Sequence, residues 1–102
     1  MKASAPTYTL DRLPAMLELA RLAIDLVAAE QDHKLARIHY HDRIHDYEDR
    51  HGRLAERLNP GNPRHAAVIA FSATQYTEYA AAKRRVYNAK RRLQAAVSRL
   101  GA

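Results

Sequence analysis

The sequence predicts an all-α fold, an antiparallel hairpin of two long helices, and three observations support it. The 102 residues are rich in the helix formers Ala, Leu, Arg and Glu and include only three Gly and four Pro. Apolar residues recur at helical spacing through most of the chain, and no stretch alternates as a β-strand would. One cluster of helix-breaking residues, at 59–63, divides the chain into two helical segments.

The first helix is expected to span about 11–58. Residues 1–10 show no periodicity and are predicted to form a mobile N-terminal segment. Asp11 suits the N-cap position because it places Pro14 in the first turn, where a missing backbone N–H is harmless. Residues 11–102 are then expected to form a single helical domain.

Two apolar runs follow each other along this first helix. The first run consists of Leu13, Leu17, Ala20, Ile24, Val27, Leu35 and Ile38. The second run consists of Tyr40, Ile44, Tyr47, His51, Leu54 and Leu58. The runs are out of phase near residues 38–40, which predicts a stutter, a bend or a break in the helix at about 38–42. Gly52 is expected only to weaken the later part of the helix.

The sequence Asn-Pro-Gly-Asn-Pro at 59–63 predicts a turn over 59–62. Its first Pro ends the preceding helix and its Gly permits a reversal of the chain. Asn62 followed by Pro63 is typical of a helix N-terminus, because Pro needs no hydrogen-bond partner there. The second helix is therefore expected over about 63–100.

The second helix repeats in heptads like a coiled coil. Its large residues at this spacing are Tyr79, Val86, Leu93 and Leu100, and the small residues that follow three positions later are Ala82, Ala89 and Ala96. This alternation predicts a seam for close helix packing. A hairpin centred on the turn would leave residues 11–20 as an apolar overhang. An overhang needs a cover, either a third helix folded back or a second subunit, and we expect a homodimeric helical bundle.

Charge is distributed unevenly along the chain. Residues 1–58 carry nine Lys/Arg and ten Asp/Glu, whereas residues 59–102 carry eight Lys/Arg and a single acid, Glu78. The triplet Lys-Arg-Arg occurs at 83–85 and again at 90–92, on the side of the helix away from the seam. This asymmetry predicts an acidic partner for the second half of the chain.

The basic helix supplies the candidate site. Its predicted polyanion-binding residues are Lys83, Arg84, Arg85, Tyr87, Lys90, Arg91 and Arg92. Lys and Arg neutralise phosphates, and Tyr can stack on an unpaired base. The function predicted first is a non-enzymatic module that binds nucleic-acid backbone without sequence specificity. The alternative is a protein–protein adaptor or inhibitor that docks this helix on an acidic surface of another macromolecule.

Two interpretations in which some or all of the basic charges bind no partner remain open. The basic helix could be a solvated helix face whose aliphatic stems pack and whose charges serve no partner. Part of its charge could also be neutralised within the hairpin, because a turn-centred register places Glu30 and Asp32 near Lys90 and Arg91.

The His-rich stretch between residues 33 and 51 offers a weaker candidate. His41, His45 and Asp49 are spaced by four and share a helical face, as metal ligands would require. However, the chain has no Cys, and no Glu lies between two His as in zinc proteases. A polar face with local His–Asp pairs, such as His45 with Asp49, is the favoured interpretation, and no cofactor is predicted.

Several classes of protein are disfavoured by what the sequence lacks. No Gly-rich phosphate loop or nucleophile motif is present, so we expect no enzyme. No apolar run reaches the roughly 18 residues of a membrane span, and the N-terminal residues lack the apolar core of a signal peptide. We therefore expect a soluble, cytoplasmic protein without a membrane partner.

Overall fold

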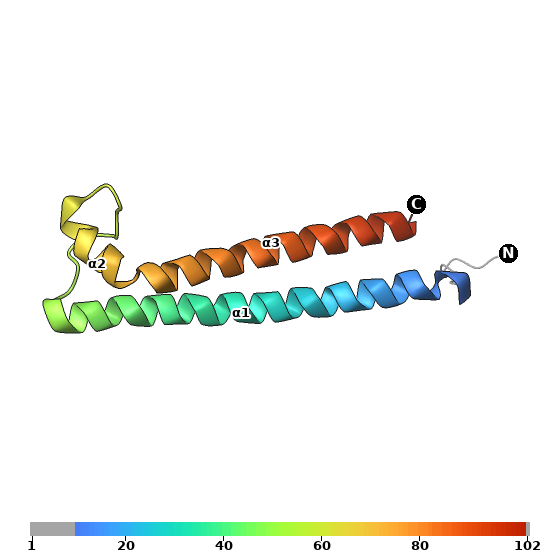
Figure 1. The fold of residues 1–102 in the computed structure, drawn as a ribbon, viewed down its shortest axis with the longest axis horizontal. Helices are drawn as coiled ribbons and strands as arrows, with labels where there is room; N and C mark the ends of the chain where they lie inside the picture. Colours follow the sequence, from blue (N-terminus) through green and yellow to red (C-terminus); the bar gives the residue numbers. More distant parts are fainter. Residues whose placement is uncertain (1–9, 102) are drawn as a thin grey trace.

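The computed structural model describes residues 10–101, which form an antiparallel helical hairpin (Figure 1). Its elements in chain order are the 3-10 turn Leu10–Arg12, α1 (Leu13–His51), the 3-10 turn Pro63–His65, α2 (Ala66–Phe71) and α3 (Ala73–Gly101). The two long helices pack side by side in a rod of 70 × 21 × 20 Å. The predicted all-α class and helical hairpin are confirmed. The predicted mobile segment 1–10 lies, apart from Leu10, outside the described residues.

Helix α1 is continuous, so the break expected at 38–42 is wrong. The side that packs on α3 carries a half-buried residue every seven positions. These residues are Leu19, Leu26, His33, Tyr40 and Tyr47. This series crosses residues 38–40 without a change of phase. The apolar run from Leu13 to Ile38 lies on the opposite side of the same helix, where its large members are exposed. The two runs are therefore two faces of one helix, and no break is needed between them.

Helix α1 ends at His51, seven residues before the predicted end near Leu58. Gly52 adopts φ +91°, a conformation that side chains disfavour and Gly permits. Its N–H donates to the Glu48 carbonyl oxygen at 2.7 Å. The Glu48 carboxylate accepts a further bond from the Leu54 N–H at 3.0 Å. Gly52 therefore terminates the helix, where we expected it only to weaken it.

The connection between the long helices is held by its own hydrogen bonds. The Asn62 side chain accepts from the Arg64 N–H, which confirms Asn62 as the predicted N-cap before Pro63. The Asn59 N–H donates to Nδ1 of His65 at 2.9 Å, and His65 is buried. This histidine thus fixes the start of the returning chain against the turn.

The predicted second helix over 63–100 is interrupted at Ser72, between α2 and α3. The Ser72 hydroxyl donates to the Val68 carbonyl at 2.8 Å, a bond that commonly bends helices. Arg43 of α1 holds the end of α2: its Nε donates to the Phe71 carbonyl at 3.1 Å, and its guanidinium lies 3.6 Å from the centre of the Phe71 ring. The interruption lets α2 lean away from the α1–α3 axis (Figure 1).

The packing register differs from a hairpin centred on the turn. Three pairs that define it are Arg12 with Leu100, which are joined by a hydrogen bond, Tyr40 with Tyr76, and Tyr47 with Phe71. Residue i of α1 therefore lies opposite about residue 115 − i of α3, rather than 121 − i. The shift follows from the early end of α1 at Gly52, and it shortens the predicted overhang of residues 11–20 to about residues 11–13.

The seam of α3 packs as the heptads predict. Ala82, Ala89 and Ala96 are 1%, 3% and 7% exposed, and the large residues between them are half-buried. The register places Ala89 opposite Leu26 and Ala96 opposite Leu19, so each small residue of α3 packs against a large residue of α1. Within residues 10–101, neither long helix has an apolar stretch that could cross a bilayer.

An aromatic cluster extends the seam toward the turn. The ring of Tyr79 stacks on His33 with centroids 5.2 Å apart and on Tyr40 at 5.8 Å. Tyr76 meets Tyr40 edge-on at 5.5 Å. Burial, reinforced by Tyr76 and Tyr79, raises the pKa of Tyr40. Large rings here take the place of the Leu–Ala contacts nearer the termini.

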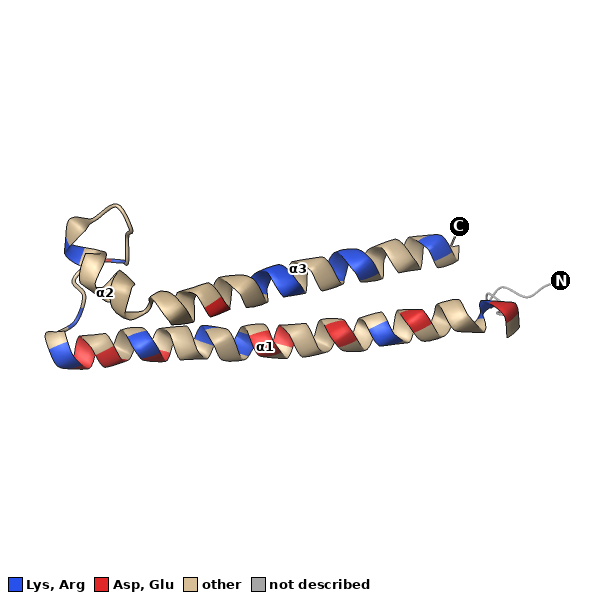
Figure 2. Cartoon of the chain, in the orientation of Figure 1, with Lys and Arg blue, Asp and Glu red and all other residues tan. Residues whose placement is uncertain are grey.

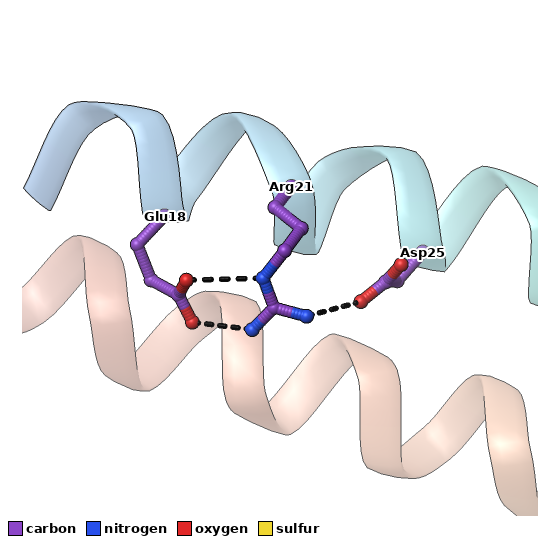
Figure 3. A network of polar contacts seen from close by, with 3 residues as sticks. All are labelled: Glu18, Arg21 and Asp25. Carbon is purple, nitrogen blue, oxygen red and sulfur yellow. Dashed lines mark hydrogen bonds and ion pairs between the residues drawn. The ribbon is translucent and has the colours of Figure 1, made fainter. Parts of the chain in front are cut away.

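Along an exposed edge of α1 that borders α3, Arg21 holds two carboxylates (Figure 3). Its guanidinium binds Glu18 through two nitrogens, at 2.6 and 3.0 Å, and Asp25 at 3.2 Å. The hydrogen bond from Arg21 lowers the pKa of Glu18, and the charge of Arg99 on α3 contributes to the same direction. The three residues form a fork along one edge of the helix.

The alanine seam is tested by overpacking it. Ala89→Leu is expected to lower stability by about 1–3 kcal/mol, because no space exists for three more carbons opposite Leu26. Thermal melts followed by circular dichroism should show a Tm lowered by roughly 5–20 °C. Ala95→Leu, at an exposed position of the same helix, is the matched control. Equal melts for the two variants would show that Ala89 does not face α1.

The fork at Arg21 predicts a pH-dependent contribution to stability. Because the pKa of Glu18 is lowered in the folded protein, the contribution is present above the ordinary pKa of Glu and is lost as pH falls through the lowered value. Arg21→Ala should return the pKa of Glu18 toward its ordinary value, whereas Arg37→Ala should leave it unchanged. Carboxyl chemical shifts followed by NMR during acid titration measure both, and a Glu18 pKa insensitive to Arg21 would contradict the assignment.

Candidate nucleic-acid interface

The two Lys-Arg-Arg triplets project from α3 because the alanine seam fixes how that helix is rotated. Ala82 and Ala89 face α1, so the three residues after each of them turn outward. All six basic side chains, at 83–85 and 90–92, are exposed. Figure 2 shows them as two blue bands on α3, a helix with a single acidic residue. We call these six residues the basic face.

The basic face consists of three columns along the helix, because residues seven apart lie above one another. Arg84 and Arg91 form the middle column and point directly away from α1. Lys83 and Lys90 form one edge. Arg85 and Arg92 form the other edge, which Arg99 extends toward the C-terminal end. The basic charge therefore covers more than half of the circumference of α3.

One edge of the basic face lies beside a row of acids on α1. Acidic residues recur there every seven positions, at Asp11, Glu18, Asp25 and Asp32. The charge of Arg99 helps to lower the pKa of Glu18, which requires the two side chains to be near each other. The acidic row therefore lies next to the arginine edge. One and two heptads further along the pair, the same spacing brings Asp25 beside Arg92 and Asp32 beside Arg85. The seven-residue spacing of these acids is visible in the sequence. A register centred on the turn, however, did not place them beside the arginine edge of α3.

Internal neutralisation of the basic face is nevertheless incomplete. Within residues 10–101, none of its six side chains forms an ion pair. In particular, Glu30 and Asp32 do not pair with Lys90 or Arg91, because the register differs from a turn-centred one. The middle column faces solvent and is the farthest from the acidic row. Both triplets are therefore available to a partner.

Tyr87 adds an aromatic surface to the basic face. It is 60% exposed, and the guanidinium carbon of Arg91 lies 5.8 Å from the centre of its ring. A shallow hollow lined by Asn88, Arg91, Arg92 and Ala95 adjoins it on the outward side of α3. Tyr76, in contrast, is held against Tyr40 and belongs to the aromatic cluster.

The His-rich stretch is not assembled into a site. Within residues 10–101, no group of three His, Cys, Asp or Glu side chains is placed to hold a metal ion. His41, His45 and Asp49 are all exposed, and Nδ1 of His45 lies 3.4 Å from Glu48 rather than pairing with Asp49. His33 instead lies in the seam, where its ring stacks on that of Tyr79.

Comparison with known proteins adds no relative. No protein-family model matches the chain, and neither a curated protein nor a solved structure matches it. The functional argument therefore depends on the residues of the chain itself.

Proposed function

We propose that the protein is a non-enzymatic, cytoplasmic binding module that engages nucleic-acid backbone through the basic face of α3, without sequence specificity, and assembles as a homodimer. One observation carries the proposal: six exposed Lys and Arg side chains, at 83–85 and 90–92, share one helix face and form no ion pair among the described residues. Such a density of unpaired positive charge attracts polyanions.

The spacing of the two triplets suits a phosphate backbone. Residues seven apart on a helix are separated by about 10 Å along its axis. One DNA strand advances about 3.4 Å per nucleotide, so successive triplets would meet phosphates about three nucleotides apart. Arg99 lies a further heptad along the same helix. The basic face therefore matches a regularly charged strand rather than a single anion.

Tyr87 favours nucleic acid over an acidic protein surface. Its exposed ring offers a flat face to an unpaired base, and neighbouring Arg91 can bind the adjoining phosphate. An acidic protein partner would need the charges but not this ring. Docking on another macromolecule's acidic surface is therefore the alternative that the experiments below can reveal.

Charge reversal tests the proposal directly. Arg84→Glu/Arg91→Glu should weaken oligonucleotide binding roughly tenfold or more and reduce the salt slope by about two, one for each lost phosphate contact. Fluorescence anisotropy with labelled oligonucleotides of several sequences, from low to physiological salt, measures both. Because neither triplet is paired internally, the two single substitutions should have similar effects.

The matched control for charge reversal is Arg53→Glu/Arg57→Glu. It changes the net charge equally, but at exposed positions of the connection after α1. Binding should stay close to that of the wild type. An equal loss of oligonucleotide binding in both double variants would show that the effect comes from net charge and not from the basic face. Absence of any binding at low salt would reject nucleic acid and leave an acidic protein as the partner.

Tyr87 provides a second test, one of strand preference. Tyr87→Ala should weaken binding to single strands by about 1–3 kcal/mol, since one base loses its stacking partner, and should leave duplex binding nearly unchanged. Tyr87→Phe keeps a ring and should preserve single-strand affinity. The same anisotropy assay with matched single and double strands separates these outcomes. Equal losses on both substrates would mean that the ring does not stack on bases.

A further inference from the structure

A largely apolar surface, interrupted at Gln31 and Lys34, runs along the side of α1 opposite α3. Its members are Leu10, Leu13, Leu17, Ile24, Val27, Leu35 and Ile38, each between 45% and 86% exposed. We call them the outer stripe. Single exposed apolar residues are ordinary on protein surfaces, but six large ones on one face of α1, with Leu10 in the turn before it, mark an interaction site.

The spacing of the outer stripe matches another helix. Leu17, Ile24 and Ile38 share one heptad position of α1, whose remaining member between them is Gln31. Leu13 and Val27 occupy the position three residues later in the same repeat. This is the two-position seam by which one helix packs along another. Helix α1 thus carries two seams, of which α3 covers one.

We propose that the outer stripe binds the outer stripe of a second copy, with the two α1 helices antiparallel. This inference rests on the homodimer of the proposed function and assigns its interface. A two-fold axis beside Ile24 and Val27 pairs Ile24 of one copy with Val27 of the other, and Leu13 with Ile38. The axis lies near the middle of the stripe. In the same register Leu17 faces Lys34, whose aliphatic stem can pack while its ammonium group reaches solvent.

The shape of α1 at this axis admits a close approach. A shallow hollow there is lined by Ala23, Ile24, Val27, Ala28 and Gln31. Small alanines beside large branched residues let the partner's side chains enter between them. Two helices packed over about 40 Å bury roughly 1,000–1,600 Å² in total, within the range of stable interfaces.

Charge selects a second copy over other occupants. At the flanks of the antiparallel pairing Arg21 lies beside Ala28, Glu30 beside Ala23 and Arg37 beside Met16, and within the seam Lys34 faces Leu17, so no like charges meet. Arg21 is in addition held by Glu18 and Asp25 of its own helix (Figure 3). The acids beside the stripe oppose contact with an anionic membrane, which favours Lys and Arg there. Pairing through the basic face of α3 would instead bring like charges together.

Two matched variants test the interface. Sedimentation velocity at micromolar concentration should show a dimer for the wild type. Ile24→Glu should weaken dimerisation at least about 100-fold, because the two added carboxylates, one from each copy, and their water cannot be accommodated at the axis. Val97→Glu, at an apolar position 53% exposed on α3, should leave the dimer intact. A monomeric wild type, or a dimer unaffected by Ile24→Glu, would overturn the inference.

Cysteine cross-linking tests the orientation independently of these variants. The chain contains no Cys, so Leu13→Cys and Ile38→Cys each introduce a unique thiol. Mixed together, the two variants should cross-link to each other and not to themselves. Cross-linking of each variant only to itself would indicate parallel helices and overturn the pairing. This readout remains decisive if Ile24→Glu fails to fold.

The same proteins distinguish this inference from the binding proposal. A dimer of the expected orientation that binds no oligonucleotide would support the interface and reject the nucleic-acid function. A monomeric wild type that binds oligonucleotides would overturn the interface and leave the basic face as proposed. Oligonucleotide anisotropy and sedimentation on one preparation therefore separate the two.

Discussion

The structure depends on the contact between the alanines of α3 and the large side chains of α1. Ala82 and Ala89 are almost fully buried because the register sets His33 and Leu26 against them. Small residues let the helix axes approach, and each large residue then fills the space above one alanine. The same contact fixes the rotation of α3, so the heptad that buries Ala89 also presents Arg84 and Arg91 to solvent.

The helical class, the turn and the phase of α3 could be predicted from sequence, because each follows from local signals. The heptads at 79–100 and the cap at Asn62 need no knowledge of the partner helix. The candidate basic residues followed from the same phase, and their exposure agrees with it. These features are fixed within one helix or one turn.

Other features could not be predicted, because they depend on contacts between helices. Two apolar runs out of phase are compatible with a broken helix or with a helix that has two faces, and only the position of α3 decides between them. Gly52 ends α1 by adopting φ +91°, although a Gly inside a helix pattern is often tolerated. That early end moved the register by about six residues. As a result, Glu30 and Asp32 do not pair with Lys90 and Arg91, and the acidic row of α1 lies next to Arg99.

The positions of the two surfaces constrain how the proposed activities would combine. The outer stripe lies on the far side of α1 from α3, so pairing through it orders the helices as α3, α1, α1 and α3. With neighbouring axes about 8–10 Å apart, the two α3 helices would lie roughly 25–30 Å from each other. Arg84 and Arg91 of each copy point away from its own α1, and therefore away from the other copy. Such a dimer presents two basic faces in opposite directions, which suits holding two separate strands rather than clamping one.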